Sequence, residues 1–163
     1  MILKFYSKPL AAHCIPERDA SILRVVIGEW DTKTTNEIYG HVEHEVHSLV
    51  AHPEYHKGAL HNDIALLFLK TPVKFEPNIA PICLPDDTEI FDHQKCFVAG
   101  WGKDRFGKEG LYQNILKKIE VPVVPSAKCE AALRTTRLGR RFQLGESFIC
   151  AGGESGQGKK VCD

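Results

Sequence analysis

The chain has 163 residues, of which 43% are hydrophobic and 26% charged, so it has enough apolar surface for a folded core. Basic and acidic residues both number 21, and this zero net charge gives no general basis for binding nucleic acid or an anionic membrane. No apolar run approaches the length of a membrane span. We therefore expect neither a nucleic acid nor a membrane as a partner.

Short apolar segments separated by Gly, Pro and Asp predict strands, and many short strands predict an all-β barrel or sandwich. The predicted strands are residues 23–27, 45–50, 64–69, 96–100 and 117–121. Residues 81–93 are rich in Pro and Asp and are expected to connect two β units. One short helix is predicted, with Ser126 as its N-cap and good helix formers from Ala127 to Arg134.

Six cysteines stand at wide spacings, as in secreted domains held by disulfides. None forms a Cys-x-x-Cys pair, which disfavours zinc-ribbon and redox interpretations. The residues are Cys14, Cys83, Cys96, Cys129, Cys150 and Cys162. Residues 1–8 do not form a signal peptide, because Lys4, Ser7 and Lys8 interrupt their apolar residues. We therefore expect an extracellular parent protein whose true N-terminus precedes this chain.

Two motifs contain candidate catalytic side chains. In Leu10-Ala-Ala-His13-Cys14, the small neighbours would let the backbone pack closely around an imidazole that acts as a general base. In His61-Asn-Asp63-Ile-Ala-Leu-Leu67, a carboxylate stands at the start of an apolar strand, where it needs a partner such as an imidazole N–H. Taken alone, His13 would be interpreted as a structural or simply exposed histidine. Asp63 alone would be interpreted as a residue that caps a turn.

Two further motifs follow in order, Cys96-Phe-Val-Ala-Gly-Trp-Gly102 and Phe148-Ile-Cys-Ala-Gly-Gly153. With these and Pro81-Ile-Cys-Leu-Pro85, the chain resembles the chymotrypsin-like serine proteases of the trypsin family over residues 10–163. The resemblance implies two antiparallel six-stranded barrels with the active site between them, His13 as general base and Asp63 as the carboxylate that orients it. We assign residues 1–90 to the N-terminal barrel and residues 91–163 to the C-terminal barrel, both incomplete.

The same resemblance implies truncation at both ends. The nucleophilic serine would follow three residues after Asp163, and the first strands of the first barrel would precede Leu10. The resemblance also implies a disulfide between Cys129 and Cys150, with the other four cysteines unpaired within this chain. Lys160 stands where trypsin-like enzymes carry an aspartate that binds a basic substrate side chain, so trypsin-type specificity is not expected.

Three segments more specifically resemble the clip-domain serine protease homologues of arthropods, which include masquerade-like proteins and phenoloxidase-activating factors. These segments are residues 28–32, 102–110 and 133–142. Many such homologues keep His and Asp but replace the nucleophilic Ser. The resemblance implies a non-catalytic cofactor of an extracellular immune or melanisation cascade, with a zymogen or a prophenoloxidase-type protein as partner. The alternative is an active serine endopeptidase whose serine lies beyond this chain; a structural or carbohydrate-binding β domain would explain neither His13 nor Asp63.

Two further patterns have ordinary interpretations. His41, His44 and His47 recur every third residue, but in a strand positions 41 and 44 point to opposite faces, and His44-Glu-Val-His47 does not match the metalloprotease motif. A calcium loop occurs in some members of the family, but no ligands for it are predicted here. We therefore predict no metal and no cofactor. The arginines at positions 134, 137, 140 and 141 are interpreted as a solvated loop or as a docking surface for an acidic partner.

Overall fold

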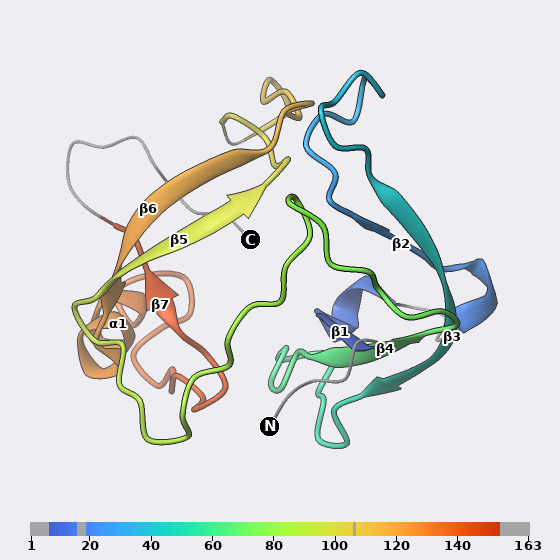
Figure 1. Cartoon of the computed structure of the whole chain (residues 1–163). Helices are drawn as coiled ribbons and strands as arrows, with labels where there is room; N and C mark the ends of the chain where they lie inside the picture. The colour runs from blue at the N-terminus through green and yellow to red at the C-terminus, as the bar shows by residue number, and fades with distance from the viewer. Residues whose placement is uncertain (1–6, 16–18, 106, 154–163) are drawn as a thin grey trace. The chain divides into compact units, whose positions relative to one another are not determined.

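The computed structural model describes residues 7–15, 19–105 and 107–153, and the chain divides into two compact units, Met1–Pro85 and Asp86–Asp163 (Figure 1). Each unit is built on an antiparallel sheet, and the described residues contain one α-helix. The prediction of an all-β protein with one short helix is confirmed. The assignment of residues 1–90 and 91–163 to two barrels stays a prediction.

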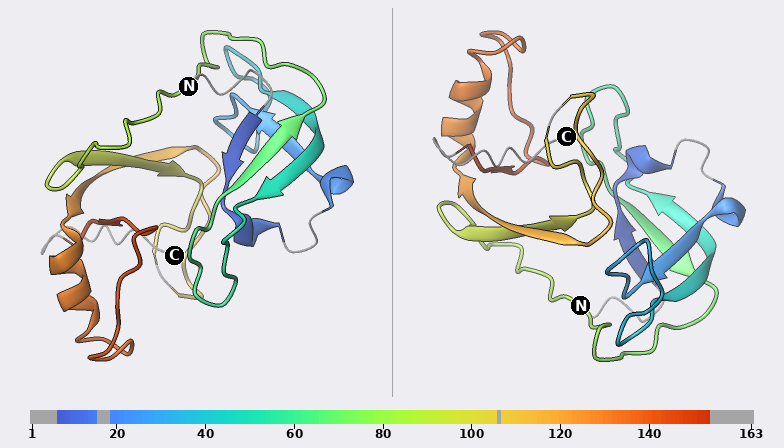
Figure 2. Two further views of the ribbon diagram at one scale, coloured as in Figure 1. Left: turned by 90° about the horizontal axis from the view of Figure 1, so that it is seen from below. Right: turned by 90° about the horizontal axis from the view of Figure 1, so that it is seen from above.

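The first unit contains a four-stranded sheet in the order β1-β4-β3-β2. Its strands are β1 (Ser7–Leu10), β2 (Arg24–Ile27), β3 (Val42–Ala51) and β4 (Ala65–Leu69). Two 3-10 turns, η1 (Ala12–Cys14) and η2 (Ala20–Ile22), lie between β1 and β2. Figure 2 shows β1 in blue beside β4 in green, with β3 in teal on the other side of β4. β1 is not among the predicted strands.

The core of the first unit follows the alternation of β4, where Ala65, Leu67 and Leu69 are buried. They pack with Val46 of β3 and with residues of the flanking segments: Ala12, Ile15, Val73 and Ile79. A bulge at His47 shifts the pairing of β3, since Val46 lies opposite Leu69 and Ser48 opposite Phe68. The extra residue moves the inward-facing positions from even to odd numbers, which is why Leu49 packs against the same core.

The second unit contains a three-stranded sheet in the order β5-β6-β7. Its strands are β5 (Lys95–Gly100), β6 (Lys117–Val124) and β7 (Cys150–Ala151), and the helix α1 (Ser126–Leu133) follows β6 directly. Val121 and Val123 are the buried positions of β6. The Cys129–Cys150 disulfide joins α1 to β7, with 6.3 Å between the Cα atoms, as the family resemblance implied.

The N-cap of α1 differs from the prediction. Pro125, not Ser126, is the N-cap, because its carbonyl accepts the first helical hydrogen bond, from the Cys129 N–H at 2.9 Å. Pro125 has φ −53° and ψ 137°, so its backbone is extended and helical dihedrals begin only at Ser126. Among the described residues, no helix has the length and apolar character needed to cross a bilayer.

Candidate active site

The pairing of β1 with β4 brings His13 and Asp63 together. Leu10, the last residue of β1, lies opposite Ala65, the first residue of β4. In an antiparallel pair, the segment that leaves one strand lies beside the segment that enters the other. His13 follows Leu10 within η1, and Asp63 stands two residues before Ala65, so the register of this one strand pair positions both side chains.

The carboxylate of Asp63 holds His13 at two points. Oδ1 accepts a hydrogen bond from the His13 backbone N–H at 2.8 Å, and Oδ2 lies 2.5 Å from His13 Nδ1. An ionised carboxylate only accepts, so Nδ1 carries the proton in this pair. The predicted proximity of the two residues is confirmed, and their catalytic roles stay a prediction.

Nε2, the other ring nitrogen of His13, faces the Cys14 thiol, whose Sγ lies at 3.5 Å. The His13 side chain is about half exposed (53%), whereas that of Asp63 is 18% exposed. The arrangement therefore has a shielded carboxylate that orients an imidazole through Nδ1, as a histidine general base of the triad type requires.

Competing effects act on the pKa of Asp63. Burial raises it, but the His13 side chain, the His13 backbone N–H, the charge of His13 and the Ala12 backbone N–H all lower it, in that order of size. The lowering effects prevail, so the pKa of Asp63 lies below its ordinary value. The carboxylate is therefore ionised at neutral pH and can stabilise an imidazolium.

The turn before Asp63 uses two residues with left-handed backbone. Leu60 has φ 56° and Asn62 has φ 53°. Asn adopts this region readily, and the Asn62 side-chain amide donates to the Glu54 carbonyl at 3.1 Å. For Leu60 the same region costs about 1–2 kcal/mol, which the surrounding contacts must offset. Asn62 is a positioning residue that the motif contained but whose role required the structure.

A cavity of about 280 Å³ lies against the His13 side chain. It is lined mostly by apolar residues: Ala12, Ile15, Leu49, Ala51, Tyr55 and Leu60, together with Lys57 and His13. Tyr55 has a buried hydroxyl with no hydrogen-bond partner in the described part of the chain.

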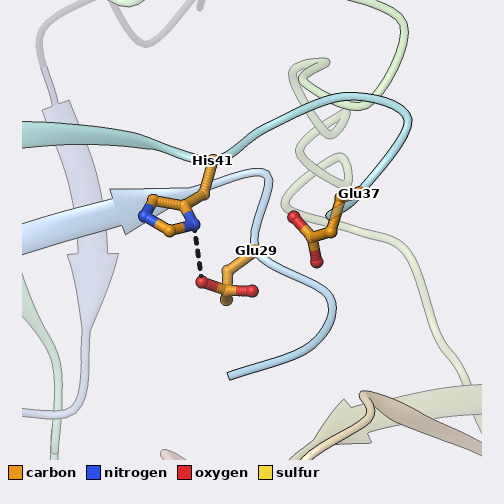
Figure 3. A group of neighbouring side chains, drawn as sticks. All are labelled: Glu29, Glu37 and His41. Atoms are coloured by element: carbon orange, nitrogen blue, oxygen red, sulfur yellow. Dashed lines mark ion pairs between the residues drawn. The ribbon is translucent and has the colours of Figure 1, made fainter. Parts of the chain in front are cut away.

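A second group of side chains could hold a cation. One ligand atom each from Glu29, Glu37 and His41 lies within 4.8 Å of the others (Figure 3). His41 Nδ1 pairs with Glu29 Oε2 at 2.8 Å, while Oε2 of Glu37 is buried and has no hydrogen-bond partner among the described residues. Two carboxylates and an imidazole are ligands for a divalent cation. No signal in the sequence relates these residues, because a turn-rich segment separates them.

The three histidines at positions 41, 44 and 47 have separate surroundings. His44 is buried in β3 and its Nδ1 bonds the Thr71 hydroxyl at 2.8 Å, whereas His41 contacts Glu29. His47 is exposed at the bulge. Cys14, Cys83 and Cys96 are free cysteines, as predicted. Lys160 and Cys162 lie outside the described residues.

An all-β fold of short antiparallel strands, with a carboxylate in direct contact with an imidazole, is characteristic of the class of chymotrypsin-like domains. The family model described as Trypsin matches residues 11–163, and the chain belongs to the trypsin family.

Three relatives show which members of the trypsin family the chain resembles. The chain is 52% identical over 148 residues to phenoloxidase-activating factor 2 of Galleria mellonella, which covers 90% of this chain and 48% of that protein. It is 43% identical over 127 residues to an inactive CLIP domain-containing serine protease of Anopheles gambiae (78% and 33%). It is 45% identical over 152 residues to an inactive CLIP domain-containing serine protease of Aedes aegypti (90% and 32%). The chain therefore spans less than half the length of these relatives.

Proposed function

We propose that the parent protein is a non-catalytic serine protease homologue that acts by binding, as a cofactor in an extracellular phenoloxidase-activating cascade. The observation that carries this proposal is the 52% identity over 148 residues to a phenoloxidase-activating factor. Two further relatives are named inactive CLIP domain-containing serine proteases. The partners we propose are proteins of the cascade, a zymogen or a prophenoloxidase-type protein.

The His13–Asp63 pair has a structural role in this proposal. Asp63 joins η1 to the turn before β4 through two hydrogen bonds, and the core residue Ala12 lies next to His13. The pair can thus hold the surface of the domain in a defined shape without any reaction taking place.

An active endopeptidase is the second candidate, and the short His13–Asp63 contact favours it. In such an enzyme Nε2 of His13 takes the proton of a serine hydroxyl as that oxygen attacks a substrate carbonyl. Asp63 would fix the tautomer and stabilise the imidazolium. By resemblance, that serine would follow Asp163, and the parent transcript decides between Gly-Asp-Ser, an enzyme, and Gly-Asp-Gly, a homologue.

The experiment has two arms. Residues 1–163 and the parent protein are labelled with a serine-directed fluorophosphonate and assayed on peptide esters, each beside its His13→Ala variant. We expect no labelling and no turnover above that control, and we expect the parent to increase phenoloxidase activity in a mixture of zymogen and activating protease. Stoichiometric labelling of the parent, or no effect in the mixture, would overturn the proposal.

A further inference from the structure

The segment between α1 and β7 contains a preorganised loop, residues 134–144, here called the basic loop. Arg134 organises it: its Nη2 pairs with Glu130 Oε1 at 2.6 Å, and its Nε donates to the Phe142 carbonyl at 2.8 Å. The other carboxylate oxygen of Glu130 accepts from the Leu144 N–H at 2.8 Å. The Glu130–Arg134 pair thus connects the two ends of the loop, and the Cys129–Cys150 disulfide links the segments that flank it.

The backbone of the basic loop is also hydrogen-bonded along its length. The Thr135 and Thr136 hydroxyls donate to the carbonyls of Ala132 and Leu133, at 2.7 and 2.6 Å. Gly139, with φ 78°, makes the turn, and its carbonyl accepts from the Phe142 N–H at 3.0 Å. A loop held in this way loses little conformational freedom when it binds a partner.

Three arginines of the basic loop have no side-chain partner within the part of the chain that the structure describes. Arg137, Arg140 and Arg141 are exposed, and none of their side chains has an ion pair or hydrogen bond with another described residue. No acidic residue lies between Glu130, which Arg134 already engages, and Glu146. In a chain of zero net charge, this loop is therefore a local excess of positive charge.

An apolar side chain stands among these charges. Leu138 is 48% exposed and lies in the sequence between Arg137 and the pair Arg140–Arg141. A guanidinium group matches a carboxylate with two parallel hydrogen bonds, and the leucine offers a contact that phosphates and sulfated sugars do not use. The four arginines of the basic loop stand within residues 134–141, a short segment, whereas long polyanions are bound by extended basic faces.

We propose that the basic loop is a docking site for an acidic protein segment, a stretch of Asp and Glu that surrounds one apolar side chain. The proposal deepens the proposed function and rests on it in one respect: a protein that acts without cleavage must act by binding another protein. Sulfated glycans and anionic lipids are the competing ligands that the experiment has to separate.

The probe is a short fluorescein-labelled peptide with glutamates on both sides of one phenylalanine, added to the 163-residue chain and followed by fluorescence anisotropy. The same peptide with glutamines in place of glutamates is its control. We expect binding of the acidic peptide only, weakening as salt rises, because surface charges are screened within about 10 Å at 0.1 M ionic strength. Equal binding of both peptides, or of neither, would overturn the proposal.

The decisive variant removes the three free arginines (Arg137→Gln, Arg140→Gln and Arg141→Gln). Its matched control removes the same charge from exposed lysines elsewhere (Lys33→Gln, Lys74→Gln and Lys108→Gln). We expect the loop variant to bind the peptide roughly 10-fold or more weakly, since each hydrogen bond between charged groups is a strong one. The lysine variant should stay within about 2-fold, because screened distant charges contribute little. An equal loss in the two variants would refute a defined site.

Two further measurements complete the test. A variant with lysine at the three arginine positions keeps the charge and the fold, so a loss of affinity in it supports paired guanidinium contacts, and full affinity would refute them. Heparin and phosphatidylserine vesicles are then assayed, and loop-dependent binding of either one that exceeds peptide binding would overturn the choice of a protein ligand. Peptide binding measures the docking site directly, whereas the phenoloxidase mixture measures the cofactor function, so either can fail without the other.

Discussion

Removal of the Cys129–Cys150 disulfide is the sharpest test of how the second unit is stabilised. The bond joins α1 to β7 across a sequence separation of 21. Closing a loop of that length lowers the entropy of the unfolded chain, which stabilises the folded state by about 3 kcal/mol at 25 °C. We expect the Cys129→Ala/Cys150→Ala variant to lose about this much free energy of unfolding. In a unit of 60–100 residues, 3 kcal/mol corresponds to a decrease in Tm of about 12–24 °C.

The two tryptophans make this measurement specific to one unit. Trp30 lies in the first unit and Trp101 in the second, so a Trp30→Phe background leaves Trp101 fluorescence as a reporter of the second unit alone. Urea unfolding of the variant is compared with that of Cys83→Ala, which removes a free, exposed thiol from the first unit.

The expected result is a lower urea midpoint for the double variant and an unchanged one for Cys83→Ala. A loss of less than about 1 kcal/mol would refute the reasoning, because it would mean that the unfolded chain already holds residues 129 and 150 near each other. The same variant also tests the basic loop, because the affinity of the loop for the acidic peptide should decrease when the disulfide that links its flanking segments is removed.

Three further predictions concern single positions. The folded-state pKa of Asp63 is depressed, so the stability that Asp63 contributes is complete above its unfolded pKa of about 3.9 and is lost as the pH falls through the lower folded value. NMR titration of the Asp63 carboxyl should show this lowered midpoint, and the midpoint should rise in His13→Ala. An unchanged midpoint would contradict the contact. Val121→Ala, at a position 2% exposed, should reduce the free energy of unfolding by about 1.5–3 kcal/mol in urea titration, and a loss near zero would mean that β6 does not form the core. Gly28→Ala should destabilise the first unit by about 1–2 kcal/mol or more, because φ is 80° at this position. An added Cβ would also lie 2.7 Å from the Asn78 side-chain amide, which donates to the Gly28 carbonyl. An unchanged thermal midpoint would contradict that strain.

The sequence by itself determined the fold class and the family. The apolar run at residues 64–69 predicts a strand, and β4 occupies Ala65–Leu69. The His13 and Asp63 motifs, with the Gly100-Trp-Gly102 segment, identify the family, and the family supplied the pairing of Cys129 with Cys150. The strand and the motifs could be predicted because each depends on residues within one short segment, whereas the disulfide pairing was implied by the family resemblance alone.

Only the tertiary structure decided how distant segments meet. The four residues of β1 include Lys8 and Pro9 and have no strand pattern, and they form a strand because β4 provides the hydrogen-bonding partner. The N-cap at Pro125 depended on backbone dihedrals that neighbouring residue types do not specify. The His13–Asp63 contact spans 50 residues, and only the register of β1 against β4 gives its geometry. Local sequence determines which residues favour a strand or a turn, whereas side-chain contacts of this kind arise only when paired strands set the distance between them.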